Sequence, residues 1–272
     1  MSYIPLPNRG VIMLYGLDTE GFLQSIITND INKLNDQKAI YSLLLNPQGK
    51  YLYDFFLVKY EKYIFLECES IYLNQIVEKL NLLKTYLKVK IKNVSKLYKV
   101  GVFMDSNTEY QEIIFRDPRH TSLGERMIYK NEVEASMGDL TEYELNRIKN
   151  LVPDGAKDMV QNSSFPLQYL IDRINGIDFN KGCYIGQEVV NRMKRQQVLR
   201  RRLYLVNGHD ILPGVGTKII NNNGEEVGEM RSSINNIGLA LLYTEKSHIN
   251  LYANKTAISV AYSTSNEFLT LG

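Results

Sequence analysis

The chain has 272 residues, a mass of 31.3 kDa and a formal net charge of +2. Its hydrophobic fraction of 44% and charged fraction of 23% are typical of a globular protein and exclude a disordered or fibrous chain. At about 150 residues per domain, this length suggests roughly two domains. No apolar run approaches the ~18 residues that span a bilayer. The N-terminus shows no basic segment followed by an apolar stretch. We therefore expect a cytoplasmic, monomeric protein without membrane contact.

Cysteine and histidine are too sparse for most metal sites. The two cysteines, Cys68 and Cys183, are too few for a disulfide framework or a zinc site made of cysteines, and the three histidines are scattered. The P-loop pattern, GxSxG and GxGxxG are absent. These observations argue against a serine hydrolase, a P-loop NTPase, a Rossmann dehydrogenase or a simple zinc enzyme. No permanently bound metal is predicted.

Residues 1–98 are predicted to form an α+β subdomain. Asp18 is a candidate N-cap for a short amphipathic helix, and apolar residues at helical spacing predict a second helix over residues 70–84. Over residues 88–92, lysines alternate with apolar residues, which is typical of a strand at a sheet edge. Strands are also expected over residues 41–45, 51–60 and 63–68.

Residues 99–202 are predicted to form a second α+β subdomain. Strands are expected over residues 98–104 and 112–116, and Thr141 with Glu144 forms a candidate capping box that starts a helix ending before Pro153.

Residues 203–272 differ in pattern, because short β-like runs alternate with glycine, proline and asparagine turns. This spacing predicts a small antiparallel barrel. Its strands are expected over residues 203–206, 218–220, 226–230, 237–242 and 256–261.

The segment 178–192 carries the most informative chemistry. Gly182 and Gly186 flank Cys183 and permit a positive φ or a close approach to a ligand. Lys181 brings a cation into the segment, and a helix over residues 187–193 would place the cysteine near a helix N-terminus. Both effects favour the thiolate. On these residues alone, Cys183 is either a reactive cysteine or a small buried hydrophobe. Cys68 lies between two glutamates in a predicted strand and is interpreted as structural.

The run Lys181-Gly182-Cys183-Tyr184-Ile185-Gly186-Gln187-Glu188 resembles the KGCYxGQE signature of the YgfZ/IBA57 folate-binding family, which is related to the glycine-cleavage T-protein, an aminomethyltransferase. Further similarity is spread over nearly the whole chain. It includes Gly16-Leu17-Asp18, Pro47-Gln48-Gly49-Lys50 with Asp54, Asp117-Pro118-Arg119, Arg147-Ile148 and Gly238-Leu239-Ala240.

The resemblance implies a GcvT-like fold with ferredoxin-like subdomains and a C-terminal barrel around a central channel. It also implies bound tetrahydrofolate or a derivative, and a role in assembling or repairing [4Fe–4S] clusters together with a scaffold or client proteins. In this picture Cys183 is the central residue, and it forms a transient adduct or briefly ligates iron or a cluster. The residues expected to act with it, in catalysis or folate binding, are Lys181, Asp54, Tyr184, Gln187, Arg192 and Gln168.

The sequence departs from the T-protein pattern at two places. Where the T-protein has paired acids, this chain has Tyr53 and Asp54, and Lys149-Asn150-Leu151 stands where a glutamate would hold the folate ring. A lysine cannot accept the N–H donors of that ring as a carboxylate does. Within the YgfZ family a glycine is usual at the position of Leu151 and an acid is common at that of Gln168. The two departures from the T-protein pattern argue against ordinary aminomethyl transfer.

Two other functions remain open at this point. A tetrahydrofolate-dependent aminomethyltransferase would use Asp54 to position the folate amine. A protein associated with tRNA or another nucleic acid would use an arginine cluster made of Arg192, Arg195, Arg200, Arg201 and Arg202. A link to tRNA modification could also be indirect, through iron–sulfur enzymes. The same arginines could bind the anionic glutamate tail of a folate or form interdomain ion pairs. The pI of about 8.3 is lower than that of a dedicated nucleic-acid-binding domain, which is above ~9.

Overall fold

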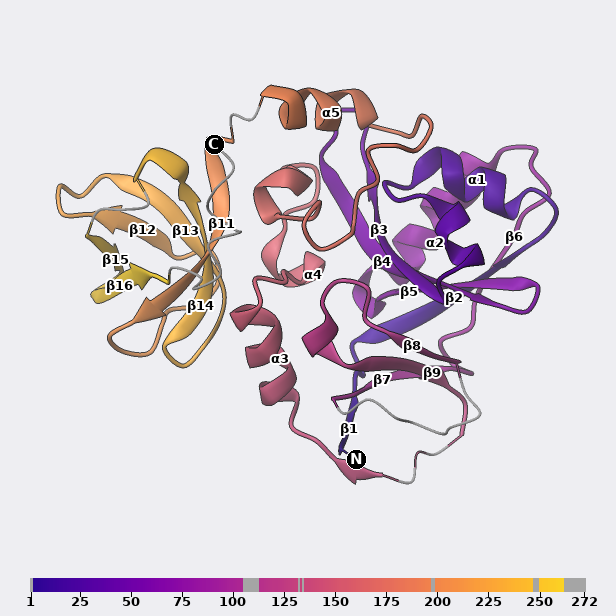
Figure 1. The fold of residues 1–272 in the computed structure, drawn as a ribbon, viewed down its shortest axis with the longest axis horizontal. Coiled ribbons are helices and arrows are strands. Elements are labelled where there is room, and N and C mark those ends of the chain that lie inside the picture. Colours follow the sequence, from indigo (N-terminus) through magenta and orange to yellow (C-terminus); the bar gives the residue numbers. More distant parts are fainter. Residues whose placement is uncertain are drawn as a thin grey trace.

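A computed structural model describes residues 2–104, 113–131, 133, 135–196, 199–246 and 250–261. The chain forms two five-stranded sheets and a closed barrel, which are joined by helices (Figure 1). None of the helices in these residues is both long and apolar enough to cross a membrane.

The first sheet is antiparallel and has the strand order β3-β4-β5-β2-β6. Both helices of this region, α1 and α2, contribute side chains to the apolar core on one of its faces. The lysine-rich strand β6 lies at the edge, as the alternation of residues 88–92 predicts. The elements are β2 (Arg9–Tyr15), α1 (Thr19–Ile26), β3 (Ala39–Leu45), β4 (Tyr51–Tyr60), β5 (Tyr63–Glu69), α2 (Leu73–Lys84) and β6 (Lys90–Asn93).

The second sheet has the order β10-β1-β7-β9-β8. Its strand β1 comes from the N-terminus and pairs antiparallel with β7 and parallel with β10, so the first residues of the chain leave the region 1–98 and join the next sheet. The strands are β1 (Ser2–Pro5), β7 (Lys99–Phe103), β8 (Ile113–Arg116), β9 (Glu125–Tyr129) and β10 (Ser136–Met137).

The C-terminal region closes into a six-stranded barrel of order β11-β14-β13-β12-β15-β16. Because β11 pairs with both β14 and β16, the barrel has no open edge. The strands are β11 (Arg201–Gly208), β12 (Lys218–Asn221), β13 (Glu226–Ile234), β14 (Ile237–Tyr243), β15 (Leu251–Ala253) and β16 (Thr256–Val260).

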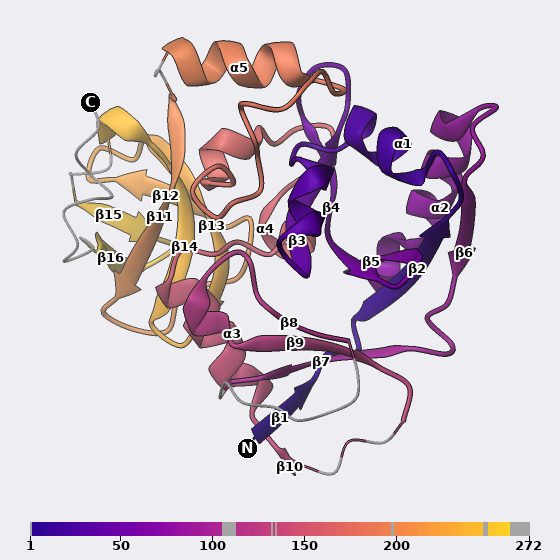
Figure 2. The same cartoon turned by 45° about the vertical axis from the view of Figure 1, so that its right-hand side comes forward.

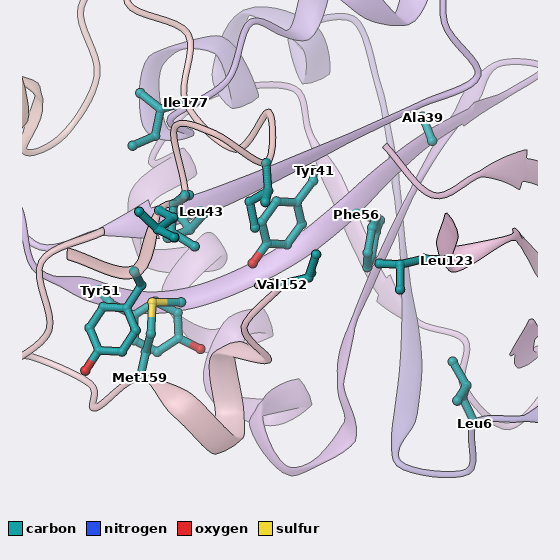
Figure 3. Close-up of a cluster of buried hydrophobic side chains, with 14 of the residues drawn as sticks. Leu6, Ala39, Tyr41, Leu43, Tyr51, Phe56, Leu123, Val152, Met159 and Ile177 are labelled. Carbon is teal, nitrogen blue, oxygen red and sulfur yellow. The ribbon is translucent and has the colours of Figure 1, made fainter. Parts of the chain in front are cut away.

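Three helices connect these layers. Helix α3 (Leu140–Lys149) packs beside β13 and β14, and α4 (Gly155–Asp158) lies between the first sheet and the barrel. Helix α5 (Gln187–Gln196) bridges the tip of the β3–β4 hairpin and the start of β11, as both views show (Figures 1 and 2). A large apolar core fills the space between the layers. In it Val152 and Met159 pack with Tyr41 and Tyr51 of the first sheet (Figure 3).

The two expected caps need correction. Helix α3 begins with Asp139 as its N-cap, and the Asp139 carboxylate accepts the backbone N–H of Thr141, so Thr141 lies inside the helix. Glu144 does not reach back to Thr141, because it pairs with Arg147 and Lys157. Asp18 does occupy the N-cap position of α1, but its carboxylate accepts the backbone N–H of Lys88. Glu144 is thus engaged by Arg147 of the same helix and by Lys157, and Asp18 by the backbone of Lys88, so neither carboxylate caps its helix.

Candidate functional site

Cys183 lies in a loop that leads into α5, and its side chain is exposed. The loop is tied to the first sheet where the backbone N–H of Asp178 donates to the carbonyl of Thr28 at 3.0 Å. Cys68, the other cysteine of the chain, is fully buried in β5, and burial raises the pKa of its thiol, with Glu67 and Glu69 adding to the effect. Cys183 is therefore the thiol that solvent and partners reach, and the structural role expected for Cys68 is confirmed.

Lys181 anchors this loop from inside the protein. Its ammonium donates to the main-chain carbonyls of Gln24 and Ile27 at 2.7 Å and of Asn29 at 2.9 Å, and only 8% of the residue is exposed. These carbonyls lie at and just beyond the C-terminal end of α1, where a cation complements the helix dipole. Burial lowers the pKa of Lys181 to about 8. The expectation that Lys181 serves the thiol as a neighbouring cation is wrong, because the ammonium points inward and donates its three hydrogens to main-chain carbonyls.

Gly186 fits the loop against the β3–β4 turn. Its φ is 83°, and a Cβ at this position would lie 2.6 Å from the carbonyl oxygen of Asn46 and 2.9 Å from the Cα of Gly49. Gly186 uses the positive φ that a glycine permits, whereas Gly182 does not have a positive φ and its Cβ would meet open space. A residue without a Cβ is therefore required at the second glycine of the motif only.

These two glycines form a matched test of the loop. We expect Gly186→Ala to lower the free energy of unfolding by about 2 kcal/mol or more, since it combines left-handed strain with a backbone clash. Gly182→Ala should change it by less than about 0.5 kcal/mol. Urea denaturation of both variants measures the difference, and equal values would contradict the packing described here.

The other residues of the motif stabilise the loop. Gln187 donates from Nε2 to the carbonyl of Gly182 at 3.2 Å, which closes the loop around Cys183. Tyr184 is 93% buried, with the Lys181 ammonium 5.1 Å from its ring centre, and burial raises the pKa of its hydroxyl. Arg192 is exposed on α5, and Gln168 is half-buried in the short helix Pro166–Tyr169.

Asp54 is buried in the core and surrounded by other side chains. It is 5% exposed, and its two carboxylate oxygens accept from the hydroxyls of Tyr41 and Tyr51, each at 2.9 Å. The Cα of Gly155 packs so tightly on this carboxylate that a Cβ there would be 1.8 Å from Oδ1. Burial raises the pKa of Asp54, and the nearby Asp154 acts in the same direction while Arg9 opposes it. Each oxygen of Asp54 therefore already accepts a hydrogen bond from a tyrosine inside the core.

A network of buried charges near Asp54 was not predicted from the sequence. Glu67 of β5 is fully buried and pairs with Arg9 of β2 and with Arg126 of β9, so it joins the two sheets. Arg147 of α3 links the network toward the barrel through Asp158 and Ser232. The Asp117-Pro118-Arg119 motif contributes a further buried ion pair. A clue in the sequence was the charged residues Glu67 and Glu69 within an otherwise apolar strand.

A small, partly open space lies beside this network. It measures about 20 Å³ and is lined by, among others, Arg9, Phe56, Arg119 and Asp154. A cavity needs about 10–15 Å³ to hold one water molecule, and a pterin ring needs many times more. This space by itself is therefore too small for a folate ring.

The described residues contain no group of three or more histidine, cysteine or acidic side chains that could hold a metal ion. An iron–sulfur cluster is usually held by four thiolates. Cys183 can therefore supply one ligand of a cluster, and the other ligands must come from outside this part of the chain.

The arginines proposed as an anion-binding group do not form one site. Arg195 and Arg200 are exposed, and their side chains, like that of Arg192, form no hydrogen bond or ion pair within the described ranges. Arg201 points to the barrel, where it donates to the Tyr243 hydroxyl at 2.8 Å and lies 3.8 Å from Glu229. Arg202 points the other way, into a pocket beneath α5. Arg201 therefore forms these contacts within the barrel, and the expectation of an interdomain ion pair is wrong for this residue.

Comparison with known proteins adds to this geometry. Residues 200–264 match the family described as "CAF17, C-terminal beta-barrel domain". A solved structure of the glycine cleavage system aminomethyltransferase T from Bartonella henselae superposes with a TM-score of 0.76 over 96% of this chain and 85% of that chain, at 13% identity. The expected GcvT-like fold with a C-terminal antiparallel barrel is thereby confirmed.

Sequence relatives carry one common name. The iron–sulfur cluster assembly factor IBA57, mitochondrial, of Homo sapiens is 31% identical over 89% of this chain and 77% of its own length. The corresponding proteins of Mycosarcoma maydis and Mus musculus are 30% and 28% identical, over 89% and 88% of this chain and 73% and 77% of their own lengths.

The expectation of a cytoplasmic protein is contradicted by these names, because all three relatives are named mitochondrial proteins. An absent N-terminal signal was too weak a basis for that expectation. With nearly nine tenths of its residues aligned to the human protein at 31% identity, this chain belongs to the IBA57 family of iron–sulfur cluster assembly factors.

Proposed function

We propose that this protein is an iron–sulfur cluster assembly factor that acts through the thiol of Cys183. The observation that carries the proposal is the placement of this thiol, exposed at the tip of a loop that the surrounding fold holds rigidly. The names of the relatives support the same role. An exposed cysteine on an anchored loop is suited to brief contact with a partner.

The chemistry of the step follows from the ligand count. The Cys183 thiol loses its proton when it binds iron, and it then supplies one thiolate to an iron ion or a cluster. Since clusters usually take four thiolates, the partner protein keeps or supplies the other ligands. Cys183 therefore serves during transfer or repair of a cluster whose other ligands come from a partner.

The finer parts of the proposal are maturation of [4Fe–4S] proteins and, through iron–sulfur enzymes, an indirect effect on tRNA modification. Tetrahydrofolate binding stays a prediction. Equilibrium dialysis tests it directly, which is preferable to intrinsic fluorescence because the chain has no tryptophan. Aminomethyl transfer is less well supported, since both oxygens of Asp54 already accept hydrogen bonds from tyrosines.

Complementation of a strain that lacks its own factor of this type tests the proposal, with activity of a [4Fe–4S] enzyme as the readout. We expect the wild type, Cys68→Ala and Asp54→Asn to restore activity and Cys183→Ser to restore none. Cys68→Ala is the matched control, because it removes the other thiol without touching the loop.

Soluble protein levels of all variants must be compared by immunoblot. Full rescue by Cys183→Ser at equal protein level would refute a role for the thiol. Loss of rescue by Asp54→Asn in a protein that is as stable as the wild type would instead favour folate-dependent transfer.

A further inference from the structure

Two turns at one corner of the first sheet present apolar side chains to solvent. The turn between β2 and α1 carries Leu17, which is 87% exposed, and the turn between α2 and β6 carries Tyr86, which is 98% exposed. Leu87 of the second turn and Leu82 in the last turn of α2 are exposed as well. We call these four residues the apolar tip. The corner lies on the side of the molecule away from the barrel (Figure 1).

The two turns are braced against each other. The Asp18 carboxylate accepts the backbone N–H of Lys88 at 2.6 Å, and a Cβ on Gly16 would lie 2.0 Å from the carbonyl oxygen of Lys88. The Lys84 ammonium donates to the carbonyl of Val89 at 3.0 Å, which ties the end of α2 to the start of β6. The main chain that carries the apolar tip is therefore fixed in place, with its apolar side chains directed into solvent.

Lysines surround the apolar tip. Residues 84–92 contain four lysines and no acidic residue. Lys88, Lys90 and Lys92 are exposed, and their ammonium groups form no ion pair within the residues that the structure describes. The ammonium groups of Lys90 and Lys92 lie 5.6 and 5.7 Å from the ring centre of Tyr15, so they lie over the end of β2, next to the apolar tip.

Acidic side chains nearby leave this corner positively charged. Asp18 is the one acid in the two turns, and it faces four lysines. Glu20, in the first turn of α1, is paired with Lys59 of β4 at 2.9 Å. The turn between β4 and β5 contributes one acid and one base, Glu61 and Lys62. The occupant of this corner should therefore be anionic.

The combination of charge and apolar exposure favours a lipid surface. Lysines on an edge strand block pairing with other strands, but this role leaves the exposed tyrosine and leucines beside them unexplained. Tyrosine prefers the membrane–water interface, leucine enters the boundary of the acyl chains, and lysines are attracted to anionic headgroups. A single-stranded nucleic acid would use the tyrosine and the lysines but would give the leucines no partner. Two turns at a corner also have a shape that reaches a flat surface (Figure 2).

We propose that this corner docks the protein on an anionic lipid surface, where the apolar tip enters the headgroup region and Lys88, Lys90 and Lys92 pair with lipid phosphates. Such peripheral contact needs no membrane-spanning segment, and it departs from the expectation of a protein without membrane contact. The tip adjoins the N-terminal end of α1, whereas Lys181 holds the Cys183 loop at the other end, about 12 Å away along the helix. Lipid contact therefore leaves the thiol free to meet a partner.

Co-sedimentation of the full chain with lipid vesicles tests this surface. We expect binding to vesicles of phosphatidylcholine that contain one third phosphatidylglycerol. Binding to vesicles of phosphatidylcholine alone should be about tenfold or more weaker, because the lysines then meet no net negative charge. Raising the salt concentration to about 0.5 M should also weaken binding to the anionic vesicles, since it screens exposed charges.

Two pairs of variants locate the contact. Tyr86→Ser should weaken binding to the anionic vesicles about tenfold or more, and Lys88→Gln about fivefold. Ile211→Ser and Lys255→Gln are the matched controls, since they remove an exposed apolar side chain and an exposed lysine from the barrel region. Each control should change the affinity less than twofold. A thermal melt verifies that all four variants are folded.

The proposal is wrong if the full chain does not bind anionic vesicles at low salt, if Tyr86→Ser binds them as the wild type does, or if the barrel variants weaken binding equally. It is also wrong if soluble polyglutamate or poly(U) binds in a manner that depends on Lys88 while vesicles do not bind, since the occupant would then be an acidic protein or a nucleic acid. The assay contains no cluster, so its failure leaves the proposed role of Cys183 unaffected.

Discussion

Replacing Glu67 by glutamine is expected to lower the free energy of unfolding by about 3–5 kcal/mol. Glu67 is fully buried and accepts from Nε and Nη2 of Arg126 at 2.9 and 2.8 Å, and it also pairs with Arg9. Loss of this carboxylate leaves two buried guanidinium groups with too little negative charge around them. Because the three residues come from both sheets, the variant should weaken the contact between the sheets.

The pH dependence of this effect has a definite sign. Burial acts to raise the pKa of Glu67, but Arg126 and Arg9 outweigh it, and the pKa is lowered. The stabilisation by Glu67 is therefore fully present above the unfolded pKa of about 4.3 and is lost as the pH falls through the lower, folded value. The difference in free energy of unfolding between the wild type and Glu67→Gln should therefore shrink as the pH falls below about 4.3. Asp54 and Glu69, whose pKa values are raised, act in the opposite sense, but they are present in both proteins.

Urea denaturation between pH 3 and pH 7 measures this prediction. Glu226→Gln is the control, because Glu226 forms an exposed ion pair with Lys218 on the barrel, and such pairs contribute about 0–1 kcal/mol. If Glu67→Gln were as stable as the control variant at pH 7, the buried network would not be an important source of stability.

Replacing Lys181 by methionine is expected to lower the free energy of unfolding by about 3 kcal/mol. Three carbonyls near the end of α1 would lose their donor, and a hydrogen bond to a charged group contributes about 1.5–3 kcal/mol. Methionine keeps much of the length and apolar contact of the lysine side chain. We therefore expect the variant to fold but to hold the Cys183 loop less firmly.

Two measurements separate this effect from a general loss of stability. The first is the rate at which the exposed thiol of Cys183 reacts with a chromogenic disulfide, which should change in Lys181→Met. It should not change in Lys59→Met, which removes an exposed lysine paired with Glu20 of the same helix.

The second measurement is the free energy of unfolding as a function of pH. The folded pKa of Lys181 is about 8, below the unfolded value of about 10.4. Between these values the unfolded state binds more protons, so the stability of the wild type gains from this group as the pH rises. The variant lacks this gain, so the difference in free energy of unfolding between the wild type and Lys181→Met should widen from pH 8 to pH 10. A constant deficit would show that Lys181 does not titrate in this range.

Much of the secondary structure was predictable from local patterns. Strand β4 spans the predicted residues 51–60, and helix α2 covers most of the predicted residues 70–84. Five of the six barrel strands were expected, because short apolar runs between glycine and asparagine turns are a local signal.

The strands β2, β9 and β15 were missed as well as β1 and β10, and the last two depend on partners far along the chain. Strand β1 has four residues, includes Pro5, and pairs with β7 almost a hundred residues later. Strand β10 has two residues and exists as a partner of β1. Short segments of this kind carry too little periodicity to be recognised, because their stability comes from the neighbouring strand.

Local sequence patterns were enough to place Cys183 in a glycine-flanked loop just before a helix, Cys68 in a strand and a barrel at the C-terminus. These features follow from hydrophobic period and turn residues, which act over a few positions. Long-range packing is what turns the Lys181 ammonium inward, encloses Asp54 between two tyrosines and brings Arg126 to Glu67. Each of these contacts joins residues that are brought together by the packing of separate layers, and no local pattern encodes which buried charge will face which.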